Sequence, residues 1–140
     1  MLRQAVVVVA SVSIASSAFA GQCEDNFTTE GSFFSGKTYK TSAQLASVKQ
    51  PDAYKRAYVF TTENGFTITS SDKDIGVISA NQTVSYGKGK TVPLNISVQP
   101  DGNGTRISLT YATSGGVTSP EDAIKRHFCL TVAAAEAGKH

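Results

Sequence analysis

Two segments in the second half of the chain alternate strictly between apolar and polar residues, and this alternation constrains the fold most. In VPLNISVQ the apolar positions run from Val92 to Val98, and in RISLTYAT they are Ile107, Leu109 and Tyr111. The stretch PDGNG between the two segments consists of residues that favour turns. Because a period of two places the apolar side chains on one face, we predict an antiparallel hairpin with one buried face.

Two further strands are predicted before this hairpin. GFTITSSD alternates in the same way, and IGVISANQTVSYG continues as a longer strand from Ile75 to Gly87. The clusters SDKD, at 71–74, and GKGK, at 87–90, supply the connecting turns. Turns this short join neighbouring strands in the antiparallel sense, so all four strands belong to one antiparallel sheet.

An additional strand is predicted near the N-terminus. SFFSGKTYKT, from Ser32 to Thr41, carries three aromatic residues around a single glycine. Aromatic residues are enriched in strands, and a glycine inside a strand marks a bend or bulge. We therefore predict one strand over this segment, kinked at Gly36.

PDAYKRAYVFTTENG, from Pro51 to Gly65, predicts a helix. Proline suits the first turn of a helix, where its missing N–H costs nothing, and Asp52 lies near the positive end of the helix dipole. Ala53 and Ala57 lie on one face of this helix. Gly65 suits the C-terminal cap, where a left-handed backbone is common.

The chain closes with a second predicted helix, TSPEDAIKRHFCLTVAAAEAG. Ser119 is a good N-cap, Pro120 suits the first helical position, and two acidic residues follow. The apolar stripe of this helix consists of Ile124, Phe128, Thr131, Val132 and Ala135. A strand over RHFCLTV is the competing interpretation, and the capping signals favour the helix.

The predicted order is β-α-β-β-β-β-α. This order predicts the α+β class: an antiparallel sheet of about four to five strands with two helices packed on one face. The other face is expected to be polar and solvated, as antiparallel sheets allow. Its predicted residues are Thr67, Thr69, Asn95, Ser97, Arg106, Ser108 and Thr110.

The first twenty residues have the pattern of a secretory signal peptide. A short n-region with Arg3 precedes the apolar run AVVVVASVSIA, and Ala18-Phe19-Ala20 is a small-x-small cleavage pattern. A membrane anchor is the alternative, but it needs about 20 apolar residues. We therefore predict a signal peptide over 1–20, a flexible segment over 21–31 and a single α+β domain over 32–140.

Cys23 and Cys129 are the only cysteines. Cys23 as a lipid attachment point is disfavoured, because Gln22 precedes it where a lipoprotein signal has a small residue. In an exported protein, two cysteines predict one disulfide, here between Cys23 and Cys129. A reactive thiol is the alternative, yet the chain has no CxxC motif, and His127 is two residues from Cys129, a spacing that does not share a helix face.

The charge pattern excludes some partners. Without Arg3 the chain has 12 basic and 11 acidic residues, a formal charge of +1, and no long basic stretch. We therefore expect no nucleic-acid partner, because phosphate binding needs clustered Lys and Arg. We also expect no membrane span after signal cleavage, since no other segment is apolar enough. The oligomeric state does not follow from the sequence.

The sequence predicts no catalytic residue, no cofactor-binding site and no metal site. His127 is interpreted as a polar residue on an exposed helix face, because general-base catalysis needs positioned partners. Asp72, Asp74 and Glu63 lack the longer set of oxygen ligands found in calcium loops. GKGK does not run into a helix as a phosphate loop does. No GxSxG elbow occurs in the chain.

Four asparagines lie in N-x-[ST] contexts: Asn26, Asn81, Asn95 and Asn103. Such asparagines accept glycans in eukaryotic secretory proteins. Asn95 is inside a predicted strand, a poor acceptor position. Coincidence in a bacterial protein is the favoured explanation, and use of the sites is left open.

The segment GFTITSSDKDIGVISA, after the first helix, resembles the C-terminal domains of the outer-membrane-assembly lipoprotein BamC and a set of small bacterial envelope proteins. The shared pattern is a helix ending at Gly65, a strand, an acidic turn, and a second strand that starts near Gly76. The resemblance covers roughly residues 32–135 and implies an accessory or binding role without catalytic residues. The chain departs from the lipoproteins because it lacks their lipid-attachment cysteine.

These observations predict an exported, non-enzymatic envelope accessory or protein-binding domain in the periplasm or outside the cell. Its expected partner is another envelope or secreted protein, bound through the polar sheet face or an exposed edge strand. The alternative is an inhibitor of a secreted or periplasmic hydrolase that presents the PDGNG hairpin. An enzyme is the third hypothesis, and it depends on a deep pocket at His127.

Overall fold

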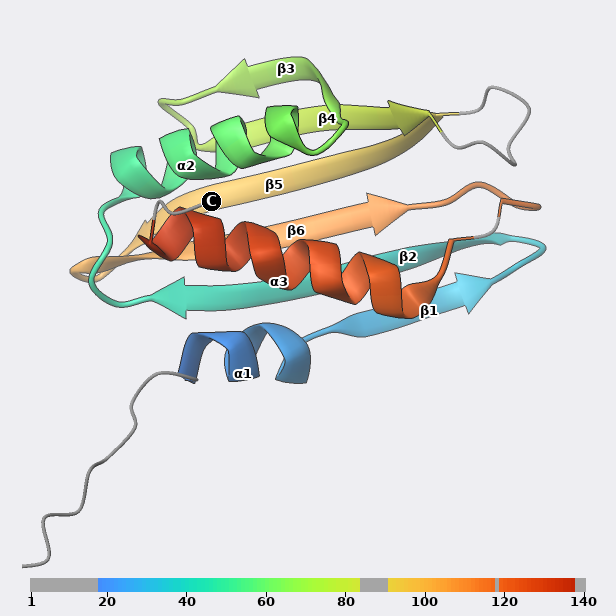
Figure 1. The fold of residues 1–140 in the computed structure, drawn as a ribbon, viewed down its shortest axis with the longest axis horizontal. Helices are drawn as coiled ribbons and strands as arrows, with labels where there is room; N and C mark the ends of the chain where they lie inside the picture. Colours follow the sequence, from blue (N-terminus) through green and yellow to red (C-terminus); the bar gives the residue numbers. More distant parts are fainter. Residues whose placement is uncertain (1–17, 84–90, 118, 138–140) are drawn as a thin grey trace, which may run out of the picture.

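The computed structural model describes residues 18–83, 91–117 and 119–137. Three helices and six strands occur in these ranges (Figure 1). In chain order they are α1 (Ala18–Asp25), β1 (Thr28–Ser32), β2 (Gly36–Leu45), α2 (Gln50–Glu63), β3 (Thr67–Asp72), β4 (Val77–Thr83), β5 (Thr91–Asp101), β6 (Gly104–Ala112) and α3 (Glu121–Ala137). The predicted apolar run at 5–15 and the GKGK turn at 87–90 lie outside the described residues.

The strands form one antiparallel sheet in the order β1-β2-β6-β5-β4-β3. Neighbouring strands are also consecutive in sequence, except that β2 pairs with β6. The connection that contains α2 therefore takes the chain from β2, near one edge, to β3 at the other, and α2 itself runs roughly along the strands (Figure 1). The α+β class is confirmed, with six strands where the sequence predicts four to five.

Helices α2 and α3 lie on the same face of the sheet and cover its apolar side chains (Figure 1). The alternation in β5 is confirmed, because Val92, Leu94, Ile96 and Val98 are each at most 2% exposed. Strand β6 contributes its own alternate residues to the same core. The largest fully buried side chains are these four from β5 together with Tyr39, Leu45, Thr61, Ile78, Ile107, Leu109, Phe128 and Val132.

The two predicted helices are confirmed with small shifts at their ends. Helix α2 begins at Gln50, one residue before the predicted start, and Pro51 falls in its first turn. Asn64 is its C-cap, and Gly65 follows with a left-handed backbone, φ +87°. Helix α3 begins at Glu121, and RHFCLTV is helical, so the strand alternative is wrong.

The predicted first strand is two strands. β1 and β2 form a hairpin, with Glu30 opposite Thr38, and the three residues 33–35 make the turn. The reason is Gly36, whose φ is +94°, a value that glycine adopts at no steric cost. A Cβ at this position would also collide with the carbonyl oxygen of Thr113. The feature interpreted as a kink is therefore a chain reversal, and it adds a strand to the sheet.

The structure corrects the prediction of a flexible segment over 21–31, because this segment holds the end of α1 and most of β1. β1 pairs with β2 only as far as Lys40. Past this point, side chains in and just after α1 bond to the uncovered edge of β2. Asn26 Nδ2 donates to the carbonyl of Ser42 (2.9 Å), and the backbone N–H of Gln44 donates to Gln22 Oε1 (3.0 Å). These hydrogen bonds order the N-terminal segment and close part of this sheet edge.

No helix in the described ranges is long and apolar enough to span a bilayer.

Candidate functional site

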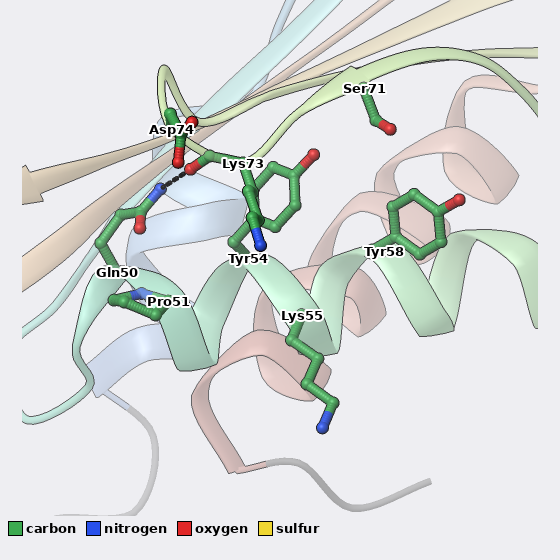
Figure 2. A pocket seen from close by; sticks show the side chains of 8 residues that line it. All are labelled: Gln50, Pro51, Tyr54, Lys55, Tyr58, Ser71, Lys73 and Asp74. Atoms are coloured by element: carbon green, nitrogen blue, oxygen red, sulfur yellow. Dashed lines mark hydrogen bonds between the residues drawn. The ribbon is translucent and has the colours of Figure 1, made fainter.

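A groove with a volume of about 840 Å³ lies between helix α2 and the edge strand β3. Figure 2 shows its lining, which consists of Gln50, Pro51, Tyr54, Lys55, Tyr58, Ser71, Lys73 and Asp74. This volume is within the range of about 300–1,000 Å³ that is typical of ligand pockets. The groove is therefore the candidate binding site of this chain.

Two tyrosines of α2 form the aromatic side of the groove. Tyr54 and Tyr58 are four residues apart, so they lie on the same face of the helix, with ring centroids 6.5 Å apart. The Tyr54 hydroxyl donates to the carbonyl of Val77 (3.1 Å), which fixes α2 against β4. Burial raises the pKa of Tyr54 above its ordinary value of 10.0, so its phenol stays neutral.

The opposite side of the groove is the end of β3 and the turn after it. Asp72 Oδ1 accepts the backbone N–H groups of Asp74 (2.9 Å) and Ile75 (3.2 Å), which fixes the turn. Gln50 Nε2 donates to the carbonyls of Lys73 (3.4 Å) and Val98 (3.1 Å). The Gln50–Lys73 bond joins the start of α2 to this turn (Figure 2). Both sides of the groove are thus held in place by hydrogen bonds.

Strand β3 is the last strand of the sheet and pairs only with β4 among the described strands. Its register shifts between Ile68 and Ser70, which marks a bulge at Thr69. Ser70 lies opposite Ser79, and Ser71 lies opposite the buried Ile78. Neighbouring residues of a strand point to opposite faces, so Ser71 faces the groove and Ser70 faces the uncovered side of the sheet.

The polar sheet face is confirmed by the register. Asn95 lies opposite Thr110, and Ser97 lies opposite Ser108, on the side away from the helices. Asn95 Oδ1 also accepts a hydrogen bond from Ser79 Oγ (2.8 Å) on the neighbouring strand. This second surface is flat, carries hydroxyl and amide groups, and lies on the opposite face from the groove.

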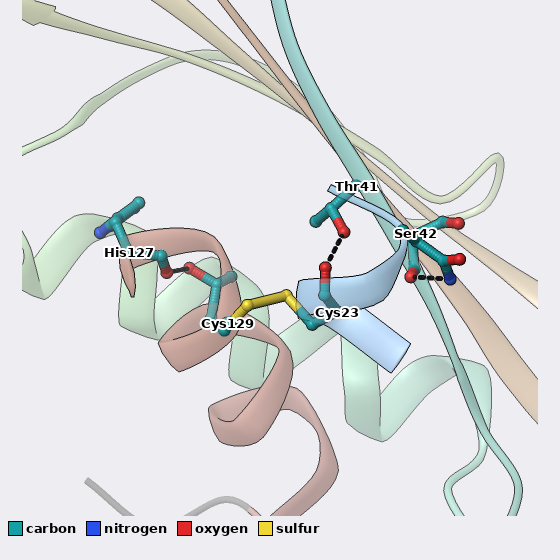
Figure 3. Close-up of a disulfide and its surroundings, with 7 residues drawn as sticks. Cys23, Thr41, Ser42, His127 and Cys129 are labelled. Carbon is teal, nitrogen blue, oxygen red and sulfur yellow. Dashed lines mark hydrogen bonds between the residues drawn. A yellow bond between two sulfur atoms is a disulfide. The ribbon is translucent and has the colours of Figure 1, made fainter. Parts of the chain in front are cut away.

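The predicted disulfide is present and joins Cys23 of α1 to Cys129 of α3 (Figure 3). The Cα atoms are 5.6 Å apart, and the two residues are separated by 106 positions in the sequence. Thr41 Oγ1 donates to the carbonyl of Cys23 (2.6 Å), so α1 is tied to β2 as well as to α3. The alternative of a reactive thiol is wrong in this structure, because both sulfur atoms are bonded.

His127 does not lie on an exposed helix face as predicted. Its ring is half-buried and stacks on Phe66 at 5.0 Å between centroids, with Phe60 at 5.8 Å. Within the described part of the chain, its buried Nε2 has no hydrogen-bond partner. Burial lowers the pKa of His127 below its ordinary value of 6.5. The residue therefore packs as an aromatic side chain in this environment.

A surface depression of about 480 Å³ near His127 is lined by Pro120, Asp122, Ala123, Arg126, His127 and Leu130. The set contains no Ser, Thr or Cys that could act as a nucleophile with histidine as its base. The Asp72 carboxylate accepts hydrogen bonds within the turn described above, to which Asp74 contributes its backbone N–H. Across the residues that the structure describes, no three His, Cys, Asp or Glu side chains gather where a metal could bind.

The sequence did not predict the groove, although it predicted the helix on one side and the turn on the other. Tyr54 and Tyr58 were visible at helical spacing, and the turn at 71–74 was visible from its composition. No sequence signal places α2 beside β3, because that contact depends on the pairing of β2 with β6. The groove therefore becomes visible only once the strand order is known.

The disulfide gives a first prediction. Replacing both cysteines, Cys23→Ser with Cys129→Ser, should lower the free energy of unfolding by about 2–5 kcal/mol, because the unfolded chain loses a long covalent loop. Urea denaturation of the oxidised protein and the variant measures this difference. A free-thiol titration of the exported protein is the control, and two reactive thiols would contradict the disulfide.

His127 gives a second prediction. Its folded-state pKa is lowered, so below pH 6.5 the unfolded chain binds a proton that the folded chain does not. The contribution of neutral His127 to the free energy of unfolding should therefore be complete above pH 6.5. It should fall as the pH drops towards the folded-state pKa. Thermal melting at pH 7.5 and pH 5 should show a smaller loss for His127→Phe than for the wild type. Equal losses would mean that His127 does not contribute.

Among known proteins, the chain is similar only to solved structures, and at low sequence identity. No protein-family model matches the chain. No curated protein matches it. The resemblance to BamC domains therefore stays a prediction.

The solved structures that are similar to the chain include three with 9–13% sequence identity. The structure of EF2215 from Enterococcus faecalis, a conserved protein of unknown function, has a TM-score of 0.49 and 9% identity over 85% of this chain and 84% of that one. CalU16 from Micromonospora echinospora has a TM-score of 0.46 and 12% identity over 73% and 89%. Ara h 8.0201 has a TM-score of 0.44 and 13% identity over 74% and 97%. Similarities at this level assign neither a family nor a function.

Proposed function

We propose that this chain is an exported, non-enzymatic protein-binding domain that acts in the periplasm or outside the cell. Its partner is another envelope or secreted protein, and it binds an extended segment of that partner along β3. The observation that carries the proposal is the groove beside an edge strand, lined by α2 on its other side. The proposal assigns no catalytic residue and no cofactor.

The backbone of β3 supports this function. An edge strand presents N–H and C=O groups on its outer side, and an extended peptide can pair with them as one more strand. β3 spans six residues, Thr67–Asp72, which is long enough for several main-chain hydrogen bonds. Five of these six residues are exposed, so side chains of the domain leave the strand accessible.

The groove supplies what main-chain pairing lacks, which is specificity for side chains. In an added strand, every second side chain of the partner points to the helix side of the sheet. On that side it meets Tyr54, Tyr58 and Ser71, which line the groove. The tyrosine rings offer apolar area. The Tyr54 hydroxyl already donates to the Val77 carbonyl, so its oxygen can only accept a further hydrogen bond. Main-chain pairing and side-chain selection thus lie next to each other.

The other sheet edge consists of β1, whose five residues are exposed, and of the part of β2 that β1 does not cover. Neither the groove nor the depression near His127 is lined by a residue of β1. On the part of β2 that β1 does not cover, the Ser42 carbonyl already accepts one hydrogen bond from Asn26, and the Gln44 N–H donates one to Gln22. Natural proteins protect edge strands in this manner against unwanted pairing. The β1 strand itself stays exposed, so what favours β3 as the binding strand is the groove that lies beside it.

The inhibitor alternative depends on the PDGNG hairpin, and the geometry there is less favourable. β5 and β6 pair up to Asp101 opposite Gly104, so only two residues form the turn. Lys49 Nζ donates to the carbonyl of Asn103 (3.2 Å), which holds the turn against the segment before α2. A two-residue turn offers little chain to fill the active site of a hydrolase. We therefore keep the edge-binding function.

The experiment is a pull-down from an envelope extract with the wild type and two matched variants. Ser71→Trp fills the groove, whereas Ser70→Trp places the same side chain on the opposite face of the same strand. Both serines are exposed, so both variants should fold. We expect Ser71→Trp to lose the captured envelope protein at least tenfold and Ser70→Trp to retain it.

The reverse result, loss with Ser70→Trp only, would move the binding site to the polar sheet face. Capture that neither variant changes would refute the groove as the binding site. Capture of a protease or lysozyme-type enzyme, released by an excess of its substrate, would support the inhibitor alternative instead.

Export gives a further prediction. The small-x-small pattern Ala18-Phe19-Ala20 should direct cleavage after Ala20, so the mature chain begins at Gly21 and keeps Cys23. Cleavage at this bond leaves Gly21–Asp25 of α1, which the disulfide and the Thr41 hydrogen bond continue to hold. N-terminal sequencing of the protein from its natural source measures the end. An intact Met1, or a lipid-modified Cys23, would contradict this prediction.

A further inference from the structure

The turn between β1 and β2 exposes two adjacent phenylalanines, Phe33 and Phe34. Phe34 is 88% exposed and Phe33 is 45% exposed, and their rings contact each other edge to face at 5.5 Å between centroids. We call these two residues the aromatic tip. It lies at the opposite end of the sheet from the β3–β4 turn that lines the groove (Figure 1).

Hydrogen bonds within the turn hold the aromatic tip in place. The hydroxyls of Ser32 and Ser35 bond to each other (2.8 Å), and each also accepts the backbone N–H of the other serine. The carbonyl of Phe33 accepts the N–H of Gly116 (2.9 Å) from the segment after β6. The tip is thus anchored both within its own hairpin and to a distant part of the chain.

Glycines allow the backbone to pack closely around the aromatic tip. Gly31 and Gly36 flank the turn with φ values of +95° and +94°. A Cβ at Gly115 would collide with the carbonyl oxygen of Phe34. These contacts hold the backbone of the turn closely, so little backbone freedom is lost when the tip binds.

We propose that the aromatic tip inserts into an apolar pocket on a second exported protein. Aromatic side chains that project from a rigid turn are suited to be the anchor of a protein interface, where a few residues in desolvated pockets carry most of the affinity. The hydroxyls of Ser32 and Ser35 surround the rings with hydrogen-bonding groups that suit a polar rim. The pocket has room for at least the Phe34 ring.

A lipid surface fits the aromatic tip less well. The two partly exposed rings offer less apolar surface than one myristoyl chain, and a single myristoyl chain gives only marginal membrane binding without a basic patch. Around the tip, the acidic Glu30 and Glu121 accompany the basic Lys37, and Thr29 Oγ1 donates to Glu121 (2.8 Å). Among the residues that the structure describes, this mixture supplies no basic patch, so these residues do not by themselves anchor the chain to a bilayer.

A second copy of this chain also fits less well. A stable interface buries about 800 Å² on each partner, and two phenylalanine side chains supply only a fraction of that area. A partner with a concave pocket and its own rim supplies the remaining contact. The partner is therefore a different protein with a pocket large enough for an aromatic ring.

The test begins with photocrosslinking in cells that export the protein. Benzoylphenylalanine at position 34 should crosslink to one exported protein, which mass spectrometry identifies and which is then purified. Its affinity is measured by calorimetry against the wild type, Phe34→Ser, Phe34→Leu and Leu130→Ser. Leu130 is the matched control, because it is an apolar side chain of α3 that is 48% exposed.

We expect Phe34→Ser to raise the Kd at least tenfold, Phe34→Leu to raise it less, and Leu130→Ser to change it less than twofold. Thermal melting should be unchanged in Phe34→Ser, because the ring makes few contacts within the fold. Ser71→Trp, which blocks the groove, separates the two proposals. If this variant leaves the crosslinked partner bound, the aromatic tip acts independently of the β3 groove.

Three results would overturn the proposal. The first is an equal Kd for the wild type and Phe34→Ser, or no crosslinked protein. The second is a crosslink only to the chain itself, with sedimentation equilibrium showing a dimer that Phe34→Ser dissociates. The third is flotation with vesicles of phosphatidylethanolamine and phosphatidylglycerol that Phe34→Ser abolishes, because the tip would then bind lipid.

Discussion

The apolar face of strands β2, β5 and β6 has to be removed from water, and helices α2 and α3 do this. Val92, Leu94, Ile96 and Val98 point to that face from β5 alone. Burying one such side chain is worth about 1.5–3 kcal/mol, so the core dominates the stability of the fold. The rest of the architecture follows from the need to place two helices over one sheet.

That need determines where the candidate binding groove lies. Because β2 pairs with β6, the chain must cross the sheet before it can start β3, and the connection that contains α2 does so on the covered face. The first part of this helix therefore lies beside the end of the last strand, and Tyr54 and Tyr58 line the groove there. The groove is a consequence of strand order combined with the burial of a single sheet face.

Much of the fold could be predicted from the sequence, since its signals are local. Alternation predicted β5 and β6, and the proline and glycine at the ends of the first helix predicted α2. The disulfide followed from there being two cysteines in a chain with an export signal. These features depend on residues near one another in sequence, or on counting.

The features that the sequence did not reveal depend on long-range contacts. Gly36 signals a break in a strand, but only its contact with Thr113 distinguishes a chain reversal from a kink. The sequence around His127 indicates a polar position on a helix. In the structure, however, Phe60 and Phe66 pack against its ring. Order in the N-terminal segment depends on α1 reaching Ser42 and Gln44 of β2.

The central claim is that a partner segment adds to the sheet at β3. The most direct measurement is amide hydrogen exchange of the mature domain, alone and in complex with the purified envelope partner. The account predicts slower exchange at 67–72 in the complex and unchanged exchange at 28–32 in β1. A stable complex in which the exchange of β3 stays unchanged would contradict the claim.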